Sequence, residues 1–136
     1  MNAPRQLRIT SPFGMRADPY NPQRQQFHNG IDIAVPEGTI IQSPLTGVAV
    51  ASWHDAGGHQ VIVDGVVNGQ HWRVGFAHLK EPGRSGPVEA GHHLGATGNS
   101  GARSKGPHVH ITTRLNGQWV DPLTVLDLSG FELVRG

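Results

Sequence analysis

The stretch GIDIAVPEGTIIQSPLTGVAVA, residues 30–51, decides the fold class of this chain. It holds three short runs rich in apolar and β-branched residues, Ile31–Val35, Thr39–Ile41 and Gly47–Ala51, separated by Gly and Pro. Short apolar runs with such boundaries are typical of β-strands joined by tight turns. The segment therefore predicts an all-β fold.

The same pattern continues toward the C-terminus. Gln60–Asp64 and Trp72–His78 are predicted as a central hairpin, because Asn68-Gly69 between them favours a tight turn. By contrast, residues 1 to about 27 show little periodicity and many turn formers, which predicts an irregular arm with one short strand. The remaining predicted elements are strands at His93–Ala96, His108–Leu115 and Gln118–Val120, and a helical turn from Pro122 to Leu128.

Composition limits the size and the class of the protein. A chain of 136 residues with 36% hydrophobic residues can bury one modest core. We therefore expect one domain over 1–136, with its core at about 10–125 and peripheral arms at 1–9 and 126–136. Its 19 Gly and 10 Pro, against 15% charged residues, favour strands and turns over long helices.

Charge and targeting signals exclude several functions. The net charge is +1 and no basic run occurs, so no nucleic-acid partner is expected. Neither a signal peptide nor a run of eighteen apolar residues is found, so no membrane span is expected. There are 0 Cys, so any metal must be bound by His and carboxylate, and 9 His supply imidazole.

Two histidines on one predicted strand are the first candidate site. His108 and His110 are two residues apart, so they project from the same face at roughly 7 Å. Either both bind one metal ion, or one binds it while the other reaches an activated water. The spacing leaves both arrangements open.

A second cluster lies at His28 and Asp32. Residues i and i+4 of an extended strand share a face, and a kink at Gly30 would let the two side chains converge on one ion. A third candidate is His78, which is the last residue of a predicted apolar strand. A histidine at a strand terminus is well placed to face a cleft.

These motifs carry a family resemblance. His28-x-Gly30-x-Asp32, an isolated His78 and Gly106-Pro107-His108-x-His110 occur in the order of the lysostaphin-type zinc metalloendopeptidases, the LytM-like peptidoglycan hydrolases. The chain resembles that family over roughly residues 10 to 125. The flanking sequence also resembles the family at Pro36-x-Gly38-Thr39, at Gly47-Val48-Ala49 and at Gly95-x-x-Gly98-Asn99-Ser100-Gly101.

The resemblance implies a fold, a cofactor and roles. The fold would be a mainly antiparallel β-sheet of the duplicated hybrid motif type, with a substrate groove and little helix. One Zn²⁺ per chain would be bound by His28, Asp32 and His110, with His78 and His108 as the catalytic pair. The implied activity is hydrolysis of the cross-links or stem peptides of bacterial peptidoglycan. We expect a monomer acting outside the cytoplasm, at the cell wall or with a phage.

Two other functions compete with the endopeptidase. A catalytically silent module of the same fold could bind the wall and activate other hydrolases, but such relatives have lost ligands and this chain retains all five residues. A histidine phosphocarrier also uses paired histidines, yet it has no need of Asp32 as a ligand. Tyr20, Asn21 and Arg24 border the substrate or lie in an exposed loop.

Overall fold

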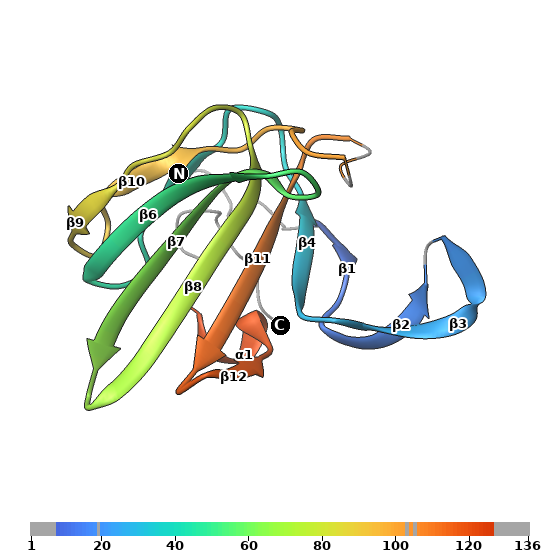
Figure 1. Ribbon diagram of the computed structural model, residues 1–136, viewed down its shortest axis with the longest axis horizontal. Coiled ribbons are helices and arrows are strands. Elements are labelled where there is room, and N and C mark those ends of the chain that lie inside the picture. The colour runs from blue at the N-terminus through green and yellow to red at the C-terminus, as the bar shows by residue number, and fades with distance from the viewer. Residues whose placement is uncertain (1–7, 19, 103, 105, 127–136) are drawn as a thin grey trace, which may run out of the picture.

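The computed structural model describes residues 8–18, 20–102, 104 and 106–126, and these residues are mostly β-structure (Figure 1). The strands are β1 (Arg8–Ser11), β2 (Gly14–Asp18), β3 (Asn21–His28), β4 (Gly30–Ala34), β5 (Ile40–Gln42), β6 (Gly47–His54), β7 (Gly58–Val67), β8 (Gln70–Leu79), β9 (Gly86–Val88), β10 (His93–Ala96), β11 (His108–Leu115) and β12 (Gln118–Val120), and the helix among the described residues is α1 (Pro122–Val125). The predicted all-β class is confirmed.

One antiparallel sheet forms the body of the molecule. Its strand order is β1-β4-β11-β8-β7-β6-β9, with β12 paired to β11. The hairpin of β7 and β8 lies near its middle, as predicted, and Asn68 and Gly69 between them have φ of 52° and 77°. Two residues with positive φ form the turn whose twist suits a two-residue hairpin.

Strand alternation separates a core face from a polar face. Ile31 and Ile33 of β4 and Val109 and Ile111 of β11 are 0% exposed and belong to the hydrophobic core. Alternate residues on these strands point to the opposite face. The polar face of the same strands therefore carries the residues between them, including Asp32, His108 and His110.

Two small sheets flank the main one. β5 pairs with β10, and β2 pairs with β3. In Figure 1 the β2–β3 hairpin extends to one side of the main sheet, beyond β1 and β4. This hairpin leads directly into β4 through one residue, Asn29.

The predicted irregular arm is wrong over its described part. Residues 8–28 form three strands, β1, β2 and β3, instead of one. Most of β3 is exposed, so the hairpin has no alternating apolar pattern to reveal it. The sequence also gave no sign of the three-residue strand β9. The predicted helical turn forms over Pro122–Val125, while 127 and 128 lie outside the described residues.

Gly30 has a different role from the predicted kink. It lies within β4, paired with Thr112 of β11, and its φ is not positive. A Cβ at this position would lie 2.1 Å from the Ile111 carbonyl oxygen. Glycine is therefore needed for the close approach of β4 to β11, which sets the distance between Asp32 and His110.

Candidate active site

A cleft of about 750 Å³ lies over the polar face of the main sheet. Its lining includes residues of β4, β8 and β11, the β2–β3 hairpin, and the turn between β6 and β7. All five residues singled out from the sequence line it: His28, Asp32, His78, His108 and His110. The fold thus brings together three stretches of chain that are far apart in sequence.

Strand register places Asp32 beside His110. The two residues are direct partners in the β4–β11 ladder, and His110 Nδ1 lies 2.7 Å from Asp32 Oδ1. His108 is two residues away on the same face, and its Nε2 lies 4.0 Å from the same oxygen. The expectation that the two histidines share a face is confirmed.

His28, the last residue of β3, reaches the same carboxylate from the other side. Its Nε2 lies 3.5 Å from Asp32 Oδ2. Its Nδ1–H donates to the Pro12 carbonyl oxygen at 2.9 Å, and Ser11 Oγ lies 3.4 Å from that nitrogen. The hydrogen bond to Pro12 orients the ring so that Nε2 faces Asp32.

The donor set of His28, Asp32 and His110 fits a zinc ion. One ligand atom from each residue lies within 4.8 Å of the other two. Two imidazoles and one carboxylate are a ligand set that catalytic zinc sites use, with a further coordination position left open. The geometry therefore offers a metal site among the described residues.

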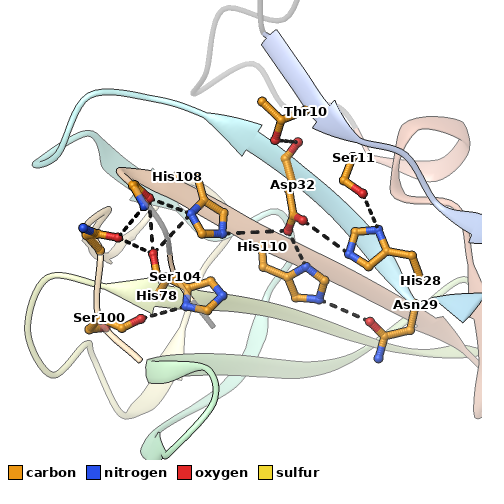
Figure 2. A network of polar contacts seen from close by, with 12 residues as sticks. Thr10, Ser11, His28, Asn29, Asp32, His78, Ser100, Ser104, His108 and His110 are labelled. Carbon is orange, nitrogen blue, oxygen red and sulfur yellow. Dashed lines mark hydrogen bonds and ion pairs between the residues drawn. The ribbon is translucent and has the colours of Figure 1, made fainter. Parts of the chain in front are cut away.

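Sequence reasoning missed Asn29. Its Oδ1 lies 3.2 Å from His110 Nε2, the ring nitrogen that does not face Asp32. Figure 2 shows this amide directed at the imidazole edge away from the carboxylate. Acceptors of this kind fix the tautomer and orientation of ligating histidines. No spacing rule in the sequence marks Asn29, because its role depends on the β4–β11 pairing.

His78 and His108 form a second group beside the first. Their ring centroids are 4.5 Å apart, with an interplanar angle of 40°. Figure 2 shows this pair at one end of the polar network and the Asp32 cluster at the other. His78 Nδ1–H donates to the Ser100 carbonyl at 2.7 Å, and His108 Nδ1–H donates to the Gly106 carbonyl at 2.8 Å. The Nε2 atom of each ring takes no part in these two hydrogen bonds.

A β-bulge aims His78 into the cleft. The β7–β8 register shifts between His59 and Val61, and His78 has a φ of 64°. A positive φ is uncommon for a residue with a side chain and occurs often at functional sites. Bulges redirect side chains in the same way near active sites. His78 therefore lies at an irregularity within β8, one residue before the strand ends.

Burial and charge shift three pKa values in the site. Burial lowers the pKa of His28 below 6.5, although Pro12 and Asp32 oppose this shift. Burial likewise lowers the pKa of His78, against the effect of the Ser100 carbonyl. For Asp32, burial raises the pKa, but the hydrogen bond and charge of His110, with the charges of the other histidines, bring it below 3.8. Near neutral pH, His28 and His78 are therefore neutral and Asp32 is ionised.

The remaining histidines and tryptophans divide between the cleft and other surfaces. His54 and Trp119 line the cleft, and so does Tyr20, whereas Arg24 is exposed outside it. Trp119 also packs against the Arg114 guanidinium, 4.5 Å from its ring centroid. Trp53 is 56% exposed and meets His59 edge to face.

The sequence and the fold both match a known family. The model of peptidase family M23 matches residues 26–122. DD-carboxypeptidase/endopeptidase Mpg of Neisseria meningitidis is 36% identical over 119 residues, which cover 87% of this chain and 27% of Mpg. Peptidoglycan DD-endopeptidase ShyA of Vibrio cholerae is 30% identical over 119 residues, covering 85% of this chain and 27% of ShyA. The chain thus spans about a quarter of the length of these relatives.

Solved structures support the same assignment. The catalytic domain of lysostaphin from Staphylococcus simulans superposes with a TM-score of 0.70 at 25% identity, covering 87% of this chain and 90% of that domain. A zinc-containing peptidase from Vibrio cholerae gives a TM-score of 0.71 at 28% identity, covering 83% of this chain and 35% of that structure. The predicted resemblance to lysostaphin-type peptidases is therefore confirmed, and the chain belongs to peptidase family M23.

Proposed function

We propose that this chain is a zinc-dependent endopeptidase that hydrolyses peptide bonds in bacterial peptidoglycan. The observation that supports this most is the position of two groups in one cleft. His28, Asp32 and His110 offer three ligand atoms within 4.8 Å of one another, and His78 and His108 lie beside them. The names of the relatives Mpg and ShyA support a substrate in the cell wall. Action on such a substrate would take place outside the cytoplasm.

In this proposal, His28, Asp32 and His110 bind one zinc ion. A zinc ion, when bound, polarises the scissile carbonyl and lowers the pKa of water toward about 7. The low pKa of His28 and of Asp32 keeps both residues in their ligating forms near neutral pH. The Pro12 carbonyl and the Asn29 amide fix the rings of the two ligating histidines.

The catalytic pair would transfer protons. Both rings donate from Nδ1 to a backbone carbonyl, so each presents an Nε2 lone pair that can accept a proton. The lowered pKa of His78 keeps its imidazole neutral, as a proton acceptor must be. One ring can thus take a proton from water, and a protonated ring can return one to the leaving amine.

Two substitutions test these roles. His28→Ala is expected to lower zinc affinity sharply, because it removes a ligand, as measured by metal analysis after dialysis. His108→Ala is expected to keep most of the zinc and to lower kcat about 10²- to 10⁴-fold on purified peptidoglycan fragments. His93→Gln, at an exposed position of β10 outside the cleft, is the control for both measurements.

Three results would contradict the proposal. Wild-type zinc content in His28→Ala would remove His28 from the ligand set. Loss of zinc in His108→Ala would show that both histidines of β11 are ligands. Stoichiometric zinc in the wild type without cleavage of any wall peptide would favour a silent wall-binding module instead.

A further inference from the structure

The β2–β3 hairpin carries three polar side chains on the face that lines the cleft. In its ladder Gly14 pairs with His28 and Arg16 pairs with Gln26. Residues two apart on a strand share a face, so Gln26 and His28 point the same way, with Arg16 directly across from Gln26. Arg16 and Gln26 both line the cleft, yet neither belongs to the metal site or the catalytic pair.

Both of these side chains have a buried polar atom without a partner. Among the described residues, nothing hydrogen-bonds to Arg16 Nε or to Gln26 Oε1. The guanidinium contacts Ser11 Oγ through Nη1 and has no carboxylate partner among the described residues. Folded proteins leave few buried donors and acceptors unpaired, so each of these two atoms calls for a partner such as a water or a ligand.

The charge of Arg16 is also unmatched. Of the described residues that line the cleft, Arg16 is the only Lys or Arg, and Asp32 is the only carboxylate. Asp32 contacts His28, His108 and His110, and no ion pair joins Arg16 to an acid in the described part of the chain. A guanidinium presents N–H donors in a planar fork that matches a carboxylate.

The hairpin geometry sets the distance from the metal site. Gln26 is two residues before His28, which is about 7 Å along the strand. An extended peptide also advances about 3.3–3.6 Å per residue, so a peptide bound along the hairpin would bring a group within about two residues of the metal site to Arg16. We propose that Arg16, with Gln26 beside it, binds a free carboxylate of the wall peptide within about two residues of the bond that is cut.

This inference rests on the proposed function and narrows its substrate class. A carboxylate at that distance can come from the C-terminal residue of a stem peptide or from a diamino acid within the cross-link. An internal glycine bridge has no such group. The site therefore favours peptides with a free carboxylate near the cut bond over glycine bridges.

Matched acid and amide substrates test the proposal with the full chain loaded with zinc. The first pair is a peptide ending in D-alanyl-D-alanine, as the free acid and as the C-terminal amide. The second pair is a cross-linked dimer whose diamino acid carboxylate is free or amidated. In the pair whose carboxylate is the one that Arg16 binds, wild-type protein is expected to prefer the acid about 10- to 100-fold in kcat/KM.

Variants then assign that preference to Arg16. Arg16→Gln should bring the acid-to-amide ratio close to one by raising KM for the acid, with kcat nearly unchanged. Arg16→Lys should recover part of the preference, because it restores the charge without the planar fork. Arg24→Gln removes the same charge from an exposed position of β3 outside the cleft, so it should keep the wild-type ratio.

Two results would overturn the inference. The first is a wild-type acid-to-amide ratio near one in both pairs. The second is an equal loss on acid and amide in Arg16→Gln together with loss of zinc, which would mean that Arg16 only supports His28 through Ser11.

A binding measurement separates this inference from the proposed function. Calorimetry of the zinc-free full chain with D-alanyl-D-alanine and its amide measures carboxylate binding without turnover. If the wild type cleaves no wall peptide, the endopeptidase proposal fails. Tighter binding of the dipeptide acid by wild type than by Arg16→Gln would still support the carboxylate site, and equal binding would refute it.

Discussion

At the scale of single residues, each imidazole of the site has one ring nitrogen that faces an oxygen acceptor. This contact orients the ring. Three of these oxygens are backbone carbonyls, so no substitution can remove them directly. The fourth is the side-chain oxygen of Asn29, 3.2 Å from His110 Nε2. The pairs are His28 with Pro12, His78 with Ser100, His108 with Gly106, and His110 with Asn29.

Asn29→Ala should therefore weaken zinc binding about 10- to 100-fold, because His110 loses the acceptor that presents Nδ1 to the metal. Competition with a chelator of known affinity measures this change. Asn29→Asp keeps an acceptor oxygen at the same place and should retain affinity close to that of the wild type. Equal affinity in Asn29→Ala and wild type would show that the β4–β11 register alone orients His110.

At the scale of elements, one loop orients both members of the proposed catalytic pair. The segment between β10 and β11 supplies the carbonyls of Ser100 and Gly106 to His78 and His108. Asn99 Oδ1 holds this loop closed by accepting from the Gly106 N–H at 3.0 Å. The position of this loop therefore sets the positions of both rings.

Gly101 packs this loop closely against the turn between β6 and β7. A Cβ on Gly101 would lie 2.5 Å from the Ala56 carbonyl oxygen and 2.5 Å from the Gly58 nitrogen, and Gly101 has a φ of 94°. Gly117 has a similar φ of 84°, but a Cβ there would meet nothing within 4 Å. Both glycines thus have a positive φ that a side chain would strain, but only a Cβ at Gly101 would clash with neighbouring backbone atoms.

Gly101→Ala should lower kcat by at least about tenfold while zinc content stays near wild type, because the displaced loop misplaces His78 and His108. Steady-state kinetics and metal analysis on the same samples check this. Gly117→Ala is the matched control: it should lose about 1–2 kcal/mol of stability from strain alone and keep wild-type kcat. Equal losses of kcat in both variants would indicate general destabilisation instead.

Elements differed in how well the sequence predicted them. The strands that carry Asp32, His108 and His110 have a strong alternating apolar pattern, because one face packs in the core. β2 and β3 lack such a pattern, since their inner face lines a polar cleft, and they were missed although β3 ends at His28. Asn29 and the loop carbonyls were missed because they act through tertiary pairing, which residue type does not reveal.

At the scale of the whole molecule, the proposed metal site joins the β2–β3 hairpin to the main sheet. His28 ends β3, Asp32 lies in β4 and His110 lies in β11. An ion bound to all three would stabilise the folded chain, by about 2.7 kcal/mol when the free metal is at 100 times its Kd.

No helix in the described part of the chain is long and apolar enough to cross a membrane.

Without metal, the stability of the whole fold should depend on pH through the buried site. The pKa of His28 and of His78 is lower in the folded chain than the 6.5 of a free histidine. Between those values the unfolded chain binds more protons than the folded one, so acid favours unfolding. The stabilising contribution is complete above about pH 6.5 and is lost as pH falls toward the folded-state values. Asp32 adds a loss in the same direction only below 3.8.

Thermal unfolding of the metal-free protein from pH 8 to pH 5 should therefore show a nearly constant Tm above pH 7 and a falling Tm below about pH 6.5. His78→Gln removes one of the two buried imidazoles and should flatten the decline. His93→Gln, which changes an exposed histidine of β10, should leave the decline as in the wild type. A Tm that rises as pH falls from 7 to 5 would mean that the folded cleft takes up protons more readily than the unfolded chain. In that case the neutral His28 that the proposed zinc site needs, and the neutral His78 that the proposed proton transfer needs, would not exist at the pH where the enzyme is proposed to act.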